Sequence, residues 1–120
     1  MILTHHEIRQ TTEKAKAAFP NFTSWEYDNG TDEDFLGFSL WGEFSPDPEE
    51  LPSKIFFITL DTYKDKWTGH LSIGKHVYFW SSADFGDACL IDTEPCETLE
   101  DAIIALKKEM ADLFRAFSAI

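Results

Sequence analysis

The chain has 120 residues, enough for one domain that buries roughly two thirds of its unfolded surface. Hydrophobic residues make up 43% and aromatic residues 15% of the sequence, which is typical of a globular fold and excludes a disordered chain. The formal net charge of −12 argues against binding to a nucleic-acid backbone or an anionic membrane, because both would need clustered Lys and Arg. The same charge favours basic partners, or serves only solubility.

The N-terminal sequence MILTHHEIRQ has no basic region and no long apolar core, so we expect no signal peptide. No run of about 18 apolar residues occurs, so we expect no transmembrane helix. Cys89 and Cys96 are too few for a disulfide framework in a chain of this size. We therefore predict a single domain, residues 1–120, that is cytoplasmic and keeps its thiols reduced.

A first helix is predicted from Thr4 to Phe19. Thr4 and Glu7 have the spacing of a capping box, and Leu3 and Ile8 occupy the two positions of a hydrophobic staple. The proline that follows Phe19 disfavours the helical conformation there, so the helix should end at that point.

Two strands are predicted next, Phe22 to Asp28 and Phe35 to Phe44, joined by a turn centred on Asn29-Gly30. Trp25 and Tyr27 should share one face of the first strand. The following loop, Ser45 to Ser53, contains three prolines and three acids, so it cannot join a sheet interior.

The stretch from Lys54 to Asp92 is dense in β-branched and aromatic residues, and we expect it to form an antiparallel meander. Short turn segments divide this stretch into several strands. The predicted strands are Ile55–Thr62, Trp67–Ile73, Val77–Trp80 and Asp87–Asp92, with a turn at Tyr63–Lys66 and a loop at Ser81–Gly86.

The hairpin at Gly74-Lys75-His76 is expected to have a three-residue loop that pairs Ile73 with Val77. A two-residue loop would mix polar and apolar side chains on both faces, whereas a three-residue loop separates them. The core face would then hold Leu71, Ile73, Val77 and Phe79. The outer face would hold Thr68, His70, Ser72, Tyr78 and Trp80.

A second helix is predicted to begin at Thr98, with Asp101 at the box position. Its apolar residues recur at spacings of four and three to the end of the chain: Leu99, Ile103, Leu106, Met110, Leu113, Phe117 and Ile120. We expect this stripe to cover the inner face of the sheet, and a coiled-coil dimer seam is the alternative. The predicted fold is a two-layer α+β sandwich, with an antiparallel meander of about five to six strands and both helices on one face.

Acidic residues gather in two stretches that lack Lys and Arg. Residues 17–53 contain nine acids and residues 77–106 contain seven, so 16 of the 22 acids lie in these stretches. If the two stretches are neighbours in the fold, they make one negative surface that speeds encounter with a basic partner. The alternative is a set of separate solvated loops.

Large aromatic side chains gather on the predicted outer face of the sheet, with His70 and Tyr63 nearby. Aromatics with a polar tip are favoured at protein interfaces, where one end is dry and the other wet. The alternative is that the Ser45–Ser53 loop folds over this face. The predicted partner-binding residues are Trp41, Phe57, Tyr78, Trp80, Asp32, Glu33, Asp34, Asp84 and Asp87.

No metal, cofactor or catalytic site is predicted. His5 and His6 would point about 100° apart on a helix, so they are poor co-ligands. Cys89 and Cys96 lack the CxxC spacing of zinc sites, and residues 28–34 depart from the calcium-loop pattern. The sequence also has no nucleophile elbow, Walker or Rossmann motif.

The expected function is that of a small acidic, non-enzymatic protein-binding module. It would dock on a basic partner through its acidic loops and its aromatic sheet face, as inhibitors, immunity-type proteins and small acidic chaperones do. That comparison is one of size and charge alone. The alternatives are a small-molecule-binding protein or enzyme with a pocket between sheet and helices, near His70 and Cys89, and a homodimeric structural module joined through the outer face.

Overall fold

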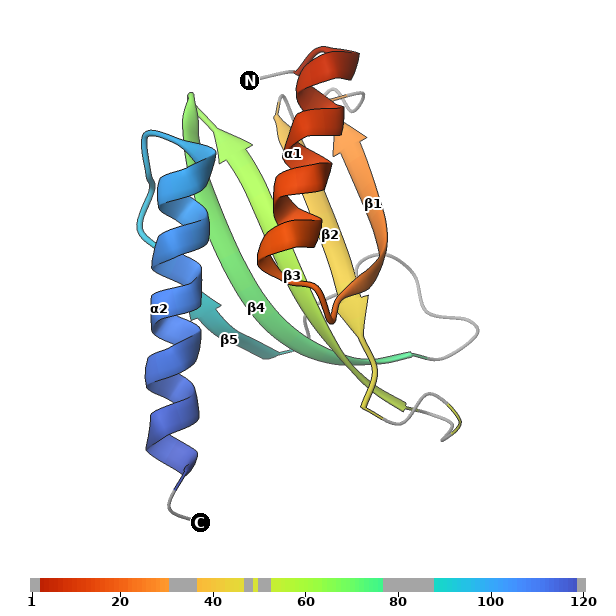
Figure 1. Cartoon of the computed structure of the whole chain (residues 1–120), viewed down its shortest axis with the longest axis vertical. Helices are drawn as coiled ribbons and strands as arrows, with labels where there is room; N and C mark the ends of the chain where they lie inside the picture. The colour runs from red at the N-terminus through yellow and green to blue at the C-terminus, as the bar shows by residue number, and fades with distance from the viewer. Residues whose placement is uncertain (1–2, 31–36, 47–48, 50–52, 77–87, 119–120) are drawn as a thin grey trace.

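The computed structural model describes residues 3–30, 37–46, 49, 53–76 and 88–118. Within these residues, seven elements follow one another (Figure 1). They are α1 (His5–Ala18), β1 (Thr23–Asn29), β2 (Phe38–Phe44), β3 (Ser53–Tyr63), β4 (Lys66–His76), β5 (Ala88–Asp92) and α2 (Leu99–Phe117). Neither helix, among the described residues, is both long and apolar enough to cross a lipid bilayer.

The strands form one five-stranded sheet in the order β1-β2-β3-β4-β5, and every neighbouring pair is antiparallel. This arrangement is a simple meander, in which each strand pairs with the next one in sequence. Both helices lie on the same face of the sheet, as Figure 1 shows. The predicted α+β fold with an antiparallel sheet covered on one face is therefore confirmed. We call the face under the helices the inner face and the opposite face the outer face.

The hydrophobic core lies between the inner face and the two helices. Alternate residues of the central strands point into it, as the two-residue period of a strand requires. The buried core residues from the sheet are Phe38, Leu40, Ile58, Leu60, Trp67, Leu71 and Ile91, and those from the helices and the N-terminal segment are Leu3, Ile8, Ala15, Phe19, Leu99, Ala102, Ile103 and Leu106. Gly69 admits α2 closely, because a Cβ atom there would lie only 3.2 Å from Leu106 Cδ2.

The N-terminus of α1 matches the predicted capping box. The Thr4 hydroxyl accepts a hydrogen bond from the backbone N–H of Glu7, and the Glu7 carboxylate accepts one from the backbone N–H of Thr4. Leu3 and Ile8, the predicted staple residues, are both buried in the core. The helix ends at Ala18, one residue before the predicted end.

The predicted hairpin at Gly74-Lys75-His76 is wrong. β4 continues to His76, and these three residues pair with Ile55, Lys54 and Ser53 of β3. Glycine is common in turns, which is why a turn is predicted at Gly74. Pairing of β4 with the full length of β3 instead keeps the backbone extended at this residue. The turn predicted at Tyr63–Lys66 is confirmed: Lys64 and Asp65 both have positive φ and connect the paired residues Tyr63 and Lys66 of β3 and β4. The predicted strand Val77–Trp80 lies outside the described residues.

The apolar stripe of α2 covers the sheet for only part of its length. The Thr98 hydroxyl caps the helix by accepting a hydrogen bond from the backbone N–H of Asp101, as predicted. Burial is complete at Leu106, whereas Phe117 is 59% exposed. Phe114, which lies beside the stripe, is 81% exposed. The first half of α2 therefore belongs to the core. The last turns of the helix are largely uncovered by the described residues.

Candidate functional site

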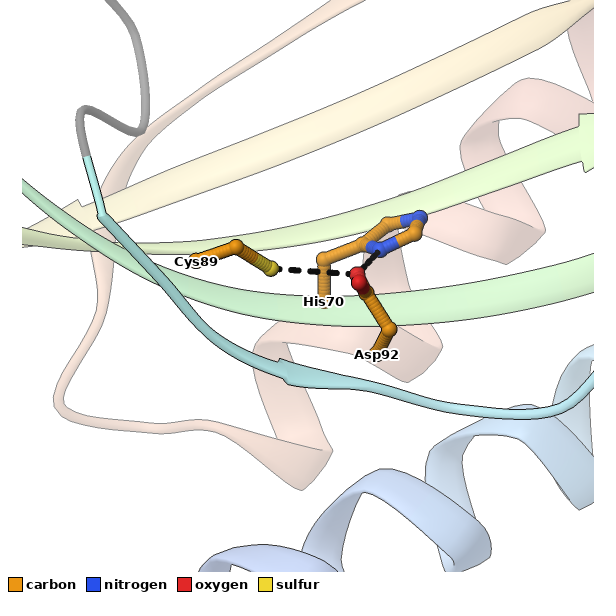
Figure 2. A group of neighbouring side chains, drawn as sticks. All are labelled: His70, Cys89 and Asp92. Carbon is orange, nitrogen blue, oxygen red and sulfur yellow. Dashed lines mark hydrogen bonds and ion pairs between the residues drawn. The ribbon is translucent and has the colours of Figure 1, made fainter.

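Three side chains from neighbouring strands meet on the outer face: His70 of β4 and Cys89 and Asp92 of β5 (Figure 2). His70 lies directly opposite Asp92 in the strand register, and its Nδ1 atom is 2.5 Å from Asp92 Oδ1. The Cys89 thiol donates to the same carboxylate oxygen over 3.1 Å. The ring nitrogen, the sulfur and the carboxylate oxygen lie within 4.8 Å of one another.

A β-bulge brings Cys89 and Asp92 to the same face of β5. Leu71 pairs with Ile91, but the next residue of β4, Ser72, pairs with Cys89, so Leu90 is the extra residue. In a regular strand, residues three apart point to opposite faces. Because of the bulge, Cys89 and Asp92 point to the same face, and the thiol is directed toward the carboxylate.

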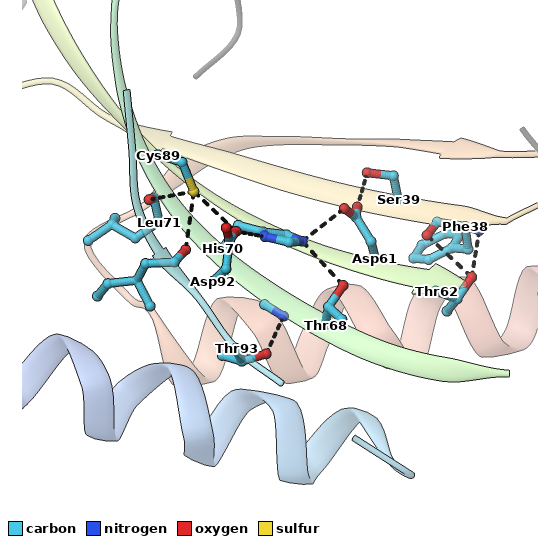
Figure 3. A network of polar contacts seen from close by, with 12 residues as sticks. Phe38, Ser39, Asp61, Thr62, Thr68, His70, Leu71, Cys89, Asp92 and Thr93 are labelled. Atoms are coloured by element: carbon cyan, nitrogen blue, oxygen red, sulfur yellow. Dashed lines mark hydrogen bonds and ion pairs between the residues drawn. The ribbon is translucent and has the colours of Figure 1, made fainter. Parts of the chain in front are cut away.

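The contacts extend from this cluster across β4 to β3 and β2 (Figure 3). His70 Nε2 lies 3.2 Å from Asp61 Oδ2 and 3.2 Å from the Thr68 hydroxyl. The Ser39 hydroxyl in turn donates to Asp61 over 2.5 Å. Both nitrogens of the imidazole ring therefore face a carboxylate, and the second carboxylate is itself held in place by a hydroxyl.

The two carboxylates raise the pKa of His70 to about 9. The hydrogen bond to Asp61 is the largest cause, partial burial opposes it, and the hydrogen bond to Asp92 adds to the increase. The same pairing with His70, helped by the Cys89 thiol, lowers the pKa of Asp92. At neutral pH the imidazole ring is therefore protonated and lies between the two carboxylates.

The Cys89 thiol is not arranged as a nucleophile. It donates to Asp92 rather than to His70, and its further neighbours are the carbonyl oxygens of Ile91 and Leu71. Burial raises the thiol pKa, and the Asp92 carboxylate raises it further. A catalytic cysteine needs the opposite, a base or a positive charge that lowers the thiol pKa.

Two of the predicted partner-binding residues lie within the described residues, and both lie on the outer face. Trp41 is half-buried and lies opposite Glu26 of β1. Phe57 is only 7% exposed, so its side chain is buried on that face rather than open to solvent. The remaining predicted residues lie outside the described residues: Asp32, Glu33, Asp34, Tyr78, Trp80, Asp84 and Asp87.

The two acidic stretches contribute to the same face but at opposite edges of the sheet. Glu26, Asp28 and Glu43 of the first stretch project from β1 and β2, as their pairing with outer-face positions requires. Asp92 of the second stretch projects from β5, at the far edge. With strands about 4.8 Å apart, β1 and β5 are separated by about 19 Å. Among described residues, acids of both stretches therefore share the outer face but are not neighbours on it.

The predicted pocket between sheet and helices does not contain His70 or Cys89, because both face away from the helices. An open hollow of about 490 Å³ lies between β5 and α2. Its lining residues are Leu90, Ile91, Asp92, Glu109, Asp112 and Leu113. A second hollow, of about 210 Å³, lies at the end of α1 against α2. Both are shallow surface depressions, and neither encloses a set of convergent catalytic groups.

The cluster of His70, Cys89 and Asp92 is not predicted from the sequence: His70 and Cys89 are named together only as residues near a possible pocket between sheet and helices, without Asp92. The sequence pattern does place His70 on the outer face. Which residues it contacts there depends on the strand register and on the bulge, which the pattern does not reveal. Comparison of the chain with protein families, with curated proteins and with solved structures gives no match in any of the three.

Proposed function

We propose that this chain is a small acidic, non-enzymatic binding protein that docks on a basic protein partner through the outer face of its sheet. The observation that carries the proposal is the setting of Trp41. Glu26 lies directly opposite it on β1, and Glu43 lies two residues away on the same face of β2. Asp28 lies two residues beyond Glu26 on the same face.

This setting suits a Lys or Arg side chain of the partner. A cation over the indole ring gains about 0.5–2 kcal/mol, depending on how far it is desolvated. The Cβ atom of Glu26 lies about 5 Å from that of Trp41 across the strands, so its carboxylate can accept hydrogen bonds from such a cation. Charge-assisted bonds of this kind are roughly twice as strong as neutral ones. Acids beside an aromatic residue on one sheet face would therefore select a basic side chain, through its charge and through its contact with the ring.

The net charge of −12 adds a long-range contribution. A field of one sign steers an oppositely charged partner and raises its association rate, and salt weakens this effect. We therefore assign anchoring to Trp41 and steering to the neighbouring acids Glu26, Asp28 and Glu43.

The test uses fluorescently labelled peptides that are rich in Arg, rich in Lys or acidic, with binding measured by anisotropy at several salt concentrations. We expect the Arg-rich peptide to bind best and the acidic peptide not to bind. Trp41→Ala should weaken binding by about 30-fold, which corresponds to about 2 kcal/mol at an interface anchor. Glu26→Gln should mainly slow association and reduce its dependence on salt.

Glu13→Gln is the matched control, because it removes the same charge from an exposed position of α1, on the helix side of the sheet. It should change binding much less than Glu26→Gln. Equal effects of the two charge changes, with no effect of Trp41→Ala, would mean that only net charge matters and that the docking site is wrong. Sedimentation of the chain alone separates self-association, the alternative use of this face, from binding of a partner.

A further inference from the structure

We propose that His70, Cys89 and Asp92 bind one divalent transition-metal ion of the zinc class, through Nδ1, Sγ and a carboxylate oxygen. These are the donor types that zinc takes in proteins, and the three atoms already lie within 4.8 Å of one another (Figure 2). The site lies on the outer face but does not depend on the docking function proposed above.

The donor distances fit a tetrahedral ion after a small adjustment. Zinc bonds of about 2.0–2.3 Å at tetrahedral angles place donor atoms about 3.3–3.8 Å apart. The present separations from Asp92 Oδ1 are 2.5 Å to His70 Nδ1 and 3.1 Å to Cys89 Sγ, as expected for atoms that share protons. The ion would replace those protons, and Asp92 Oδ1 would move away from the other two donors by less than about 1 Å. Nδ1 and Sγ lie within 4.8 Å of each other and would approach by no more than about 1.5 Å. Cys89 and Asp92 are both exposed on β5, so their side chains can make that movement.

The contacts on the other side of the ring support the assignment independently. A histidine that binds a metal usually donates its second ring N–H to a carboxylate, which fixes the tautomer and the ring orientation. Asp61 accepts at Nε2 in this way, and Ser39 and Thr68 contact Asp61 and the ring, respectively (Figure 3). Nδ1 is thereby directed at Asp92 and Cys89.

The donor set also predicts which ions bind. A thiolate and an imidazole favour zinc, cobalt, nickel and copper over magnesium and calcium, which prefer oxygen donors. Three protein donors leave the fourth position to water, as in zinc sites that exchange ligands. Cys89 and Asp92 are exposed, so an ion can enter from solvent. The negative charge of the chain raises the local concentration of cations.

Cobalt(II) is the probe for the first experiment, because a bond between thiolate and Co²⁺ gives a near-ultraviolet charge-transfer band and tetrahedral Co²⁺ gives intense visible bands. We expect both bands to saturate at one equivalent and to disappear when Zn²⁺ is added. Cys89→Ser should abolish the charge-transfer band. Cys96→Ser is the matched control and should leave it unchanged, because that thiol contacts the carbonyl of Glu94, outside the cluster.

Asp61→Asn tests the orienting role of the second carboxylate. It should keep the thiolate band, because it leaves all three donors in place, but weaken zinc binding by about 10–100-fold in a competition titration. His70→Gln should lose high-affinity binding, and circular dichroism would confirm that each variant is folded. The proposal is overturned if Co²⁺ gives no thiolate band, or if the band follows Cys96. It is also overturned if His5→Gln with His6→Gln removes the binding, which would place the ion on α1.

Discussion

At the scale of single residues, His70 has the most unusual surroundings in the described part of the chain. Its ring contacts Asp61 on one side and Asp92 on the other, and a hydroxyl of Thr68 lies beside Nε2. Isolated histidines change charge near pH 6.5, whereas the pKa of this one is about 9. The same ring can therefore serve as a charged link between strands or, once it has lost the proton on Nδ1, as a metal ligand.

His70 should make the stability of the chelator-treated protein depend on pH. Below about pH 6.5 the ring is protonated in both the folded and the unfolded chain, so its stabilising contribution is fully present. As the pH rises toward the folded-state pKa of about 9, only the folded state retains the proton, and the contribution is lost. The loss is at most about 3 kcal/mol by the linkage relation, and less because the side chain is partly exposed. Urea unfolding between about pH 6 and pH 9.5 measures it.

The groups that face His70 define the control for this prediction. Asp61, Asp92 and the Cys89 thiol face it from β3 and β5, and the thiol has a raised pKa that acts in the same direction at the upper end of the range. Cys89→Ser should therefore retain most of the dependence between about pH 7 and pH 8.5, whereas His70→Gln should flatten it. An equally steep curve for His70→Gln would assign the effect to other groups.

At the scale of elements, the two halves of α2 have different environments despite one continuous apolar stripe. Leu106 is fully buried against Gly69 of β4, whereas Phe117 and Phe114 are 59% and 81% exposed. Sequence periodicity reports which residues share a helix face, but it does not report how far the sheet extends beneath that face. The stripe therefore predicts the core correctly only as far as the half-buried residues Met110 and Leu113.

Truncation along α2 should reveal this difference as a gradient. Leu106→Ala should lower the free energy of unfolding by roughly 2–5 kcal/mol, because it leaves a cavity between the helix and the sheet. Phe117→Ala is the matched comparison and should change it by no more than about 0.5 kcal/mol in a dilute monomer. Urea denaturation measures both values. A large effect of Phe117→Ala that grows with protein concentration would show that this end of the helix is buried in self-association.

At the scale of the whole molecule, charge is the dominant property. The chain has 22 acids and ten Lys or Arg residues, and the described ion pairs of the basic residues are exposed, such as Lys14–Glu100 and Lys66–Glu97. Exposed pairs of this kind contribute only about 0–1 kcal/mol each. The excess acids repel one another, and this repulsion opposes the compact state.

Moderate salt should therefore stabilise the protein. Raising NaCl from about 10 mM to about 200 mM shortens the Debye length from about 30 Å to about 7 Å, so repulsion across the molecule is screened. We expect the thermal midpoint to rise, and a scanning fluorimetry series measures it. The double variant Glu26→Gln with Glu43→Gln should show a smaller rise, because it removes two acids from one face. A midpoint that falls with salt would show that ion pairs such as Lys14–Glu100 dominate instead.

Local sequence chemistry was sufficient for the helices and for most of the sheet. The capping box of Thr4 and Glu7, the cap at Thr98 and the alternation of β2 depend on neighbours within about four residues, so they can be identified without the fold. The α+β class followed from the order of these elements. The same local logic failed at Gly74, where a turn-forming residue lies within a strand because eleven residues of β3 pair along it.

The sequence by itself therefore determined the element types, the fold class, the strong negative charge and the residues that share the inner face. The tertiary structure alone decided which polar residues meet. Asp61, His70, Cys89 and Asp92 are brought together by strand pairing and by one extra residue at Leu90. A shift of one residue in register moves a side chain to the other face. No local pattern specifies that register or the bulge, because both result from the packing of the whole sheet.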